Sequence, residues 1–506
     1  MHRGRRLAIL LLAVFLTGCV AGQDAPEKVD TRRSGADAGE TGAGMDLQKA
    51  PGDGANPQDA QTAEAEQTQE PVSDIVGICV NRTGYITDAV KLAVFCGSEL
   101  PQEFQVIRQA DGETVFTGTL KDQGYRRQDQ EYTGYGDFSQ VQEPGGYYIE
   151  APVLGRSYFF EIGDSVYEDA LRELSGRYVR YWEGGAAFRE ERSVLEAVRE
   201  TAVLLLACEL NGDCLSDETG AEEGANGIPD LLDGIRSEVQ WLLEMQDAQT
   251  GAVCGDPARG QEEEGEGGGQ SPDPVSSAAF AMALARFSYL YQDYDTQFAT
   301  ECLKAADRAW VYVEQSGSAQ ADGWRFAAAA ELYRASGRKS FHDYVAGYLS
   351  EKDYQSRMDE SMFWGCAAYL STRQPVELSL CEEITRALMA RADEAARAAQ
   401  GSPFLARECG PDGDCGKLLE DGMYLSLVNH MVSSREYELV VENCLHYLLG
   451  RNRLSVSYPG EGEEDLKTAE NETLKPPGRG SWGRAEDGSM IFLLSETLCW
   501  QREHGE

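Results

Sequence analysis

Histidine is scarce in this sequence, and the cysteines are spaced too widely for a metal site. The 506 residues include five His, which are scattered, and no Cys-x-x-Cys motif occurs. Structural zinc and similar metals are bound by closely spaced Cys and His side chains. We therefore predict no metal site and no cofactor.

Basic residues are few relative to acidic ones. The chain has 45 Lys and Arg against 86 Asp and Glu, which gives a formal net charge of −41. Nucleic acids and anionic lipid surfaces are bound through clusters of Lys and Arg. The sequence therefore argues against nucleic acid as a partner, and we expect any membrane association to come from a lipid anchor alone.

No apolar run is long enough to cross a bilayer, which needs about 20 residues. The run at 7–16 is preceded by three Arg and ends in Leu-Thr-Gly-Cys at 16–19. Positive residues, a short apolar segment and small residues before a Cys are typical of a bacterial lipoprotein signal. We expect Cys19 to become a lipidated N-terminus that holds an exported protein at the bacterial cell surface. An ordinary signal peptide with a chance Cys is the alternative.

The composition changes along the chain and predicts four regions. After the signal peptide at 1–18, residues 19–73 are rich in Ala, Gly, Gln, Asp and Glu and poor in aromatic and β-branched residues. Such a segment cannot bury enough apolar surface to offset the entropy of ordering it, so we predict a disordered acidic tether. Two globular domains follow, at 74–164 and 165–506.

The two globular domains differ in their periodicity. In the first, short runs of strand-forming residues alternate with turns, which predicts an antiparallel β-sandwich. In the second, apolar residues recur every three or four positions, most clearly after Pro229. So many helices fit either a toroid of helical hairpins or an irregular bundle. Besides the segment after Pro229, helices are predicted at 194–209, 275–292, 296–314, 325–336, 339–349, 360–371, 378–399, 417–432, 435–449 and 488–501.

Twelve of the thirteen Cys lie beyond Cys19. Cys409 and Cys415 flank a turn-like loop and could form a disulfide, and Cys208 and Cys214 flank a similar turn. Others stand singly in apolar helical patterns, where Cys behaves as a small hydrophobic residue. This last group includes Cys302, Cys366, Cys444 and Cys499.

The β-sandwich region resembles a known module. Residues 79–85, Cys-Val-Asn-Arg-Thr-Gly-Tyr, followed by Lys-Leu-Ala-Val at 91–94, are similar to the first strands of the immunoglobulin-like module that precedes many family 9 glycoside hydrolases. Asp-Phe-Ser at 137–139 and Glu-Pro-Gly-Gly-Tyr-Tyr at 143–148 resemble its later strands.

The helical region resembles the catalytic domain of the same family. The similar segments are Asn-Gly-Ile-Pro-Asp-Leu-Leu-Asp at 226–233, Trp-Leu-Leu-Glu-Met-Gln at 241–246, residues 327–337, and His-Tyr-Leu-Leu-Gly-Arg-Asn at 446–452, which looks like the segment entering the glycan cleft. The resemblance implies an (α/α)6 barrel and decides between the two helical architectures. It also implies inverting hydrolysis of β-1,4-glucans.

The base position of the family is substituted. Inverting hydrolysis needs a carboxylate base and a carboxylic acid about 6.5–9.5 Å apart. The family base lies in an Asp-Ala-Gly-Asp motif, and counting back from Leu-Leu-Leu-Ala-Cys-Glu at 204–209 places the two Asp positions at Ala186 and Arg189. An Arg cannot accept a proton as a base does. Glu190 or Glu191 would be the base after a slip of one or two residues, although both suit a solvated first helical turn.

The acid position is substituted as well. The family acid falls on Ser481, whose hydroxyl holds its proton too tightly to serve as an acid. Glu486 is the nearest alternative, but a Glu near a helix start is commonly a charge that interacts with the helix dipole. The His-His-Arg run of the family cleft is replaced by a charged loop after Gly460, and the Asp-Glu pair of its calcium site is replaced by Asp322-Gly323.

Two classes of function follow. The first is a surface lipoprotein that binds β-glucan or a partner, with hydrolysis lost or greatly weakened. The second is an active, diverged endo-β-1,4-glucanase that uses Glu190 or Glu191 with Glu486. Each missing proton-transfer group costs about 10²–10⁴-fold in rate, so we favour the first class. Four tryptophans could stack on sugars or belong to the core: Trp182, Trp310, Trp324 and Trp364.

Overall fold

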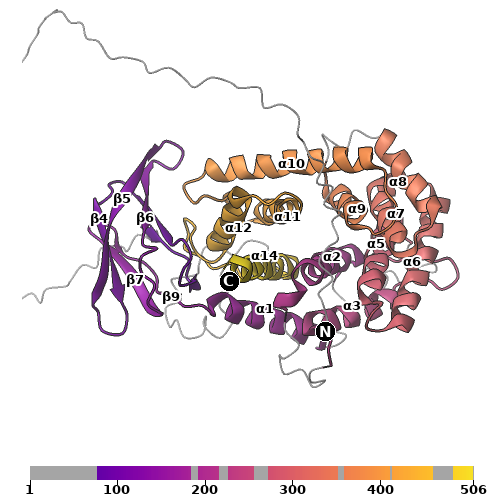
Figure 1. Ribbon diagram of the computed structural model, residues 1–506, viewed down its shortest axis with the longest axis horizontal. Coiled ribbons are helices and arrows are strands. Elements are labelled where there is room, and N and C mark those ends of the chain that lie inside the picture. The colour runs from indigo at the N-terminus through magenta and orange to yellow at the C-terminus, as the bar shows by residue number, and fades with distance from the viewer. Residues whose placement is uncertain are drawn as a thin grey trace, which may run out of the picture. The chain divides into compact units, whose positions relative to one another are not determined.

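The computed structural model describes residues 77–183, 192–215, 226–255, 272–351, 358–410, 413–459 and 482–504. It shows a sheet-rich region followed by a helical domain (Figure 1). The predicted positions Cys19, Ala186, Arg189, Glu190, Glu191 and Ser481 lie outside these ranges. None of the described helices is long and apolar enough to cross a membrane.

The sheet-rich region is a twisted arrangement in the order β1-β3-β6-β5-β4-β7-β9-β2, with β8 beside β7. The long strand β5 pairs with β4 along one part and with β6 along another, so it joins the two halves of the sandwich. Alternate residues point inward and include Phe95, Phe104 and Tyr147. The β-sandwich prediction is confirmed. The strands are β1 (Ile78–Cys79), β2 (Gly84–Tyr85), β3 (Leu92–Gly97), β4 (Glu103–Arg108), β5 (Thr114–Arg126), β6 (Glu131–Asp137), β7 (Gly145–Ala151), β8 (Gly155–Arg156) and β9 (Phe160–Ile162).

The helical domain alternates between inner and outer helices. Within the described residues, α2, α5, α7, α9, α11 and α14 form the inner ring, and α5, α7 and α9 are buried on nearly all sides. The (α/α)6 barrel is therefore confirmed, and α1 adds a helix that the periodicity did not single out. The helices are α1 (Val166–Glu183), α2 (Val194–Asn211), α3 (Asp230–Glu244), α5 (Pro274–Tyr291), α6 (Thr296–Ser316), α7 (Asp322–Ser336), α8 (Lys339–Glu351), α9 (Glu360–Ser371), α10 (Leu378–Gln400), α11 (Gly416–Met431), α12 (Arg435–Leu448) and α14 (Arg484–His504), with short 3₁₀ turns η2 (Gly212–Cys214) and η3 (Ala319–Ala321).

The segment 446–452 forms the junction with the sandwich. The Arg82 amide donates to the Leu449 carbonyl at 2.8 Å, and Asn81 Nδ2 lies 3.0 Å from His446 Nδ1. Burial, together with Arg451, holds the pKa of His446 well below its usual value. At Gly450, φ is +121° and an added Cβ would lie 2.7 Å from the Arg82 side chain, so only glycine fits. This segment therefore packs against the β-sandwich, whereas its resemblance had suggested a place in the glycan cleft.

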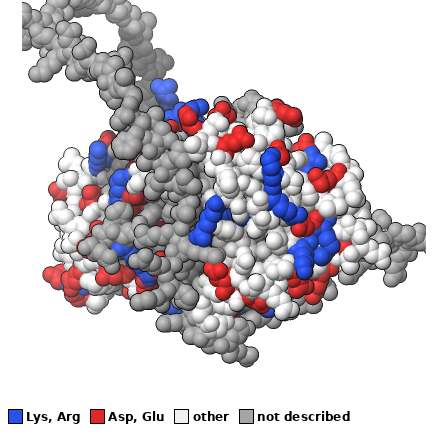
Figure 2. All heavy atoms as spheres, turned by 45° about the vertical axis from the view of Figure 1, so that its right-hand side comes forward, with Lys and Arg blue, Asp and Glu red and all other residues white. Residues whose placement is uncertain are grey.

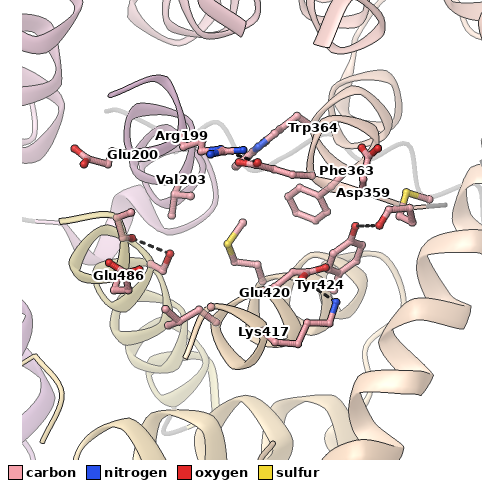
Figure 3. Close-up of a pocket in the computed structure, with 17 residues that line it drawn as sticks. Arg199, Glu200, Val203, Asp359, Phe363, Trp364, Lys417, Glu420, Tyr424 and Glu486 are labelled. Atoms are coloured by element: carbon pink, nitrogen blue, oxygen red, sulfur yellow. Dashed lines mark hydrogen bonds and ion pairs between the residues drawn. The ribbon is translucent and has the colours of Figure 1, made fainter. Parts of the chain in front are cut away.

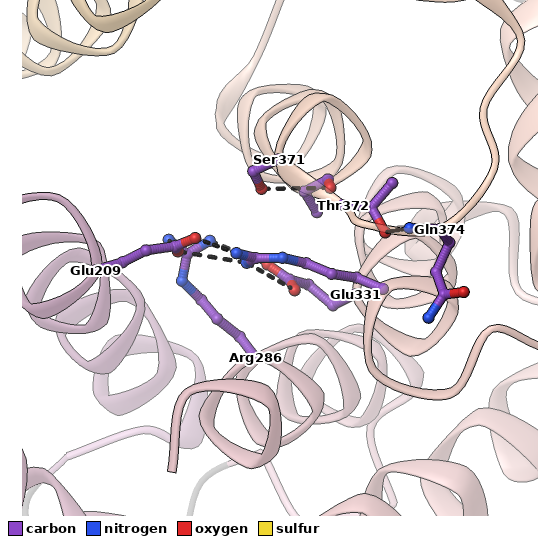
Figure 4. A network of polar contacts seen from close by, with 8 residues as sticks. Glu209, Arg286, Glu331, Ser371, Thr372 and Gln374 are labelled. Atoms are coloured by element: carbon purple, nitrogen blue, oxygen red, sulfur yellow. Dashed lines mark hydrogen bonds and ion pairs between the residues drawn. The ribbon is translucent and has the colours of Figure 1, made fainter. Parts of the chain in front are cut away.

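Four buried charges connect three inner helices (Figure 4). Arg286 on α5 lies 2.7 Å from Glu209 on α2 and 2.9 Å from Glu331 on α7. Arg334, also on α7, pairs with Glu209 and lies 3.5 Å from Glu331. Burial raises the pKa of Glu209, but the two arginines outweigh it and leave that pKa below its usual value. The cluster is electrically neutral, and two of its members, Glu331 and Arg334, belong to a segment that carries the family resemblance, 327–337.

The cysteine predictions are confirmed in part. Cys409 and Cys415 form a disulfide, and Cys302, Cys366 and Cys444 are buried free thiols. The interpretation of Cys499 was wrong, because it forms a disulfide with Cys214, 285 residues away. Periodicity shows which face of a helix is buried, but it does not show which distant segment packs there.

Acidic and basic side chains are mixed over the face of the molecule in Figure 2. Such exposed pairs contribute little to stability because water and salt screen them. Glu382 and Arg386 on α10 are an example, with side chains 71% and 65% exposed. This pair provides a matched control for the buried cluster.

We expect Glu209→Ala to lower the free energy of unfolding by about 3–5 kcal/mol, because it leaves two buried guanidinium groups short of one counter-charge. Urea denaturation of the full chain measures this loss. The control Glu382→Ala should change the same quantity by less than about 1 kcal/mol. Equal effects of the two substitutions would contradict a central role for the cluster.

Candidate functional site

A pocket of about 530 Å³ lies at one end of the inner ring (Figure 3). Its wall comes from the N-terminal halves of four inner helices, so their partly positive ends point toward the same space. The volume falls within the range of small-molecule sites, about 300–1,000 Å³. The lining includes Arg199, Glu200 and Val203 of α2, Met358 and Asp359 before α9, Glu360, Phe363 and Trp364 of α9, Gly416, Lys417, Glu420 and Tyr424 of α11, and Glu486 of α14.

Aromatic rings form the side of the pocket between α9 and α11. The ring of Phe363 lies 4.7 Å from that of Tyr424 and 5.1 Å from that of Trp364, measured between centroids. The Tyr424 hydroxyl donates to the Met358 carbonyl at 3.2 Å, which fixes the ring. These three rings are 1–2% exposed, so they form the closely packed floor of the pocket.

Of the four tryptophans singled out in the sequence, only Trp364 lines the pocket, and it is 1% exposed. Trp182, Trp310 and Trp324 belong to the hydrophobic core, with exposed fractions of 8%, 6% and 8%. The interpretation of these residues as core aromatics is confirmed.

Glu486 reaches the pocket wall, as its role as a possible acid required. Its Oε2 accepts a hydrogen bond from the Gly483 amide at 2.8 Å, three residues earlier. This is the bond by which a Glu in the first turn satisfies a free amide at a helix start. The structure thus brings Glu486 to the pocket and also gives it the helix-capping role.

Three further carboxylates on the pocket also have partners. Asp359 accepts from the Met362 amide at 3.0 Å and caps α9. Glu420 pairs with Lys417 at 2.8 Å. Glu360 pairs with Arg199 at 2.8 Å and so connects α9 to α2. Burial raises the pKa of Glu360, and Arg199 offsets part of the rise.

Glu200 is one of several pocket residues that the sequence did not single out. It accepts a hydrogen bond from the Tyr178 hydroxyl at 2.8 Å and pairs with Arg192 at 2.8 Å. Arg192 also lies 3.0 Å from Glu238 of α3, so two buried carboxylates share one guanidinium group. In Figure 3 the carboxylate of Glu200 points away from Phe363 and Trp364. The signal in the sequence was a Glu on the apolar face of a helix, between Val198 and Leu204.

Burial raises the pKa of Glu200 to about 7, although Arg192 and Tyr178 both favour its charged form. A carboxyl group with such a pKa exchanges its proton near neutral pH. The charge of Glu200 therefore depends on pH within the physiological range.

The predictions at the family's catalytic positions stay predictions. Ala186, Arg189, Glu190, Glu191 and Ser481 belong to segments that enter α2 and α14, outside the described residues. Among the residues that the structure does describe, no group of three His, Cys, Asp or Glu side chains is placed to hold a metal ion.

Comparison with known protein families finds two matches along the chain. The cellulase N-terminal immunoglobulin-like domain matches residues 76–156, and glycosyl hydrolase family 9 matches residues 187–467.

Individual relatives are distant. Endoglucanase D of Acetivibrio thermocellus is 25% identical over 456 residues, which cover 75% of this chain and 72% of that protein. A cellodextrinase of Butyrivibrio fibrisolvens is 24% identical over 491 residues, which cover 79% of this chain and 87% of that protein. A crystal structure of a metagenome-derived family 9 endoglucanase has a TM-score of 0.70 at 20% identity and covers 83% of this chain and 98% of its own. This structural likeness concerns the fold.

We expect the stability of the chain to fall as pH rises from about 4.5 to about 7, through the contribution of Glu200. In this window the folded state keeps the proton that the unfolded state has lost, so ionisation favours unfolding. Glu200→Gln removes the contribution. Urea denaturation at pH 5 and pH 8 measures the free energy of unfolding of both proteins. At pH 8 the free energy of unfolding of the variant should rise by a few kcal/mol relative to that of the unsubstituted chain. A difference that is the same at both pH values would contradict the raised pKa.

Proposed function

The chain belongs to glycosyl hydrolase family 9, and from this premise we propose that it binds a β-glucan in the pocket between α2, α9, α11 and α14, with hydrolysis lost or greatly weakened. The curated relatives named above are glucan-degrading enzymes, which makes β-glucan the first ligand to test.

The observation that carries the proposal is the engagement of the pocket carboxylates. Asp359 and Glu486 cap helices, while Glu360 and Glu420 are paired with basic side chains. Glu200 is held by Tyr178 and Arg192, and its carboxylate points away from the aromatic side of the pocket. A general acid or base must exchange a proton with the substrate or with water, and these contacts compete with that role. The substitutions at Ala186, Arg189 and Ser481 in the sequence point the same way.

The pocket nevertheless suits a sugar. Phe363, Trp364 and Tyr424 form its buried apolar floor, and the Arg199–Glu360 pair supplies donors and acceptors for hydroxyl groups. The side chains of this pair are 44% and 40% exposed, so they can reach a ligand. Binding without cleavage requires no more than these contacts.

The site of action follows from the N-terminal sequence. We propose that Cys19 carries a lipid that holds the protein at the bacterial cell surface, and that residues 19–73 connect this anchor to the two domains. The pocket would then meet polysaccharide outside the cell.

An active, diverged endo-β-1,4-glucanase is the second candidate, and the position of Glu486 in the pocket wall favours it. In that case Glu486 would be the acid and Glu190 or Glu191 the base. The two candidates differ in one observable property, the release of new reducing ends.

The test combines binding and cleavage on the same protein. We expect the full chain to be retarded in gels that contain mixed-linkage glucan or carboxymethylcellulose, and to release no more reducing ends than the Glu486→Gln variant. Retardation of the variant should be unchanged. Release of reducing ends that disappears in Glu486→Gln would overturn the proposed loss of hydrolysis and establish the second candidate.

A further inference from the structure

Two cysteines lie together on the face of the sandwich that packs against the helical domain. Cys79 on β1 is the direct partner of Val94 on β3, and the Cys96 amide donates to the Gly77 carbonyl at 2.9 Å. Because side chains on a strand alternate between its two faces, Cys79 and Cys96 point to the same side as diagonal neighbours. Both are buried in the hydrophobic cluster that continues into the helical domain, whereas Ile78 belongs to the core of the sandwich.

The two thiols are in contact. A hydrogen bond between the side chains of Cys79 and Cys96, together with burial, raises the pKa of Cys96. The thiols of Cys366 and Cys444 are buried too, but there burial and charged neighbours raise the pKa. Cys79 and Cys96 therefore form a dithiol with adjacent sulfur atoms, which are not bonded to each other in this structure.

Two disulfides show the kind of compartment in which the chain folds. Cys409 and Cys415 close a short loop, and Cys214 and Cys499 join segments that are 285 residues apart. Disulfides form and persist in oxidising compartments and are rare where thiols are kept reduced. A pair of neighbouring thiols in the same chain meets the same oxidants while the chain folds.

We propose that Cys79 and Cys96 form a further disulfide, made during folding and then enclosed between the sandwich and the helical domain. One thiolate attacks the S–S bond of a disulfide-bearing oxidant and releases one of its thiols. The second thiolate then displaces the rest of the oxidant, so that the Cys79–Cys96 bond forms as the mixed disulfide breaks. The cysteines lose two protons and two electrons, and the oxidant takes up both and ends as two thiols. The proposal is independent of what the pocket binds.

The bond reinforces the junction between the two domains. β1 has two residues and lies at one end of the strand order, beside β3, so few backbone hydrogen bonds hold it to the sheet. The residues just after it make the junction, where Asn81 contacts His446 and the Arg82 amide donates to the Leu449 carbonyl. A disulfide from β1 to β3 therefore fixes this segment to the sheet. Under the proposed lipid anchor, any pull through residues 19–73 would reach β1 first.

Peptide mapping by mass spectrometry tests the bond on the full chain, purified from the oxidising compartment of an expression host. Free thiols are alkylated during unfolding, without reductant, before digestion with trypsin. Arg82 and Lys91 lie between the two cysteines, so trypsin places them on different peptides. We expect these peptides to be joined and to separate when a reductant is added. The Cys214–Cys499 peptides are the positive control, and Cys366 should be alkylated.

Two results of the mapping would overturn the proposal. One is alkylation of both Cys79 and Cys96 while the Cys214–Cys499 peptides stay joined. The other is a bond from either cysteine to a different partner. The variant Cys96→Ala checks the pairing, because it should leave the Cys79 thiol open to alkylation.

Amide hydrogen exchange tests the role at the junction. In Cys79→Ala with Cys96→Ala, residues 77–82 should exchange at least about tenfold faster, with α5 unchanged, because a disulfide no longer opposes local opening. Cys366→Ala, which removes a single buried thiol from α9, should leave exchange at 77–82 unchanged. Equal exchange at 77–82 in the double variant and the unsubstituted chain would overturn this role, and so would faster exchange throughout the chain.

Discussion

Two arginines and two glutamates meet in the core of the helical barrel, where a single uncompensated charge would cost several kcal/mol. Arg286, Glu331 and Arg334 hold α5 and α7 against Glu209 near the end of α2. The same α2 carries Arg199 and Glu200 into the pocket from its first half. The position of the pocket wall therefore depends on charges that never contact a ligand, and this scaffold can persist when catalytic residues change.

The pocket follows from the same architecture. Inner helices that point the same way bring their N-terminal ends together, and carboxylates are stabilised there by the helix dipoles and by free amides. Asp359 and Glu486 show both effects. A ring of acidic residues at this end of a barrel is thus partly a consequence of helix capping, so acidic lining alone does not establish hydrolysis.

Sequence reasoning predicted the scaffold well, because its signals are local. Periodicity predicted the helices, and the segment 327–337 indicated the barrel through Glu331 and Arg334, which the structure shows among its buried charges. What the sequence could not provide depends on contacts between distant segments. The helical pattern indicated that Cys499 is a small hydrophobic residue, whereas in the structure it forms a disulfide with a distant Cys. The pKa of Glu200 is set by its burial against α1 and α3. Glu486 fitted two roles in the sequence, and its bond to the Gly483 amide shows the capping role.

A crystal structure of the full chain soaked with a β-1,4-glucan hexasaccharide tests most directly whether this scaffold binds without cleaving. We predict an unbroken oligosaccharide in the pocket beside the Arg199–Glu360 pair, with Glu486 still bonded to the Gly483 amide. A shortened product, flanked by two carboxyl groups about 6.5–9.5 Å apart on either side of the broken linkage, would contradict the loss of hydrolysis.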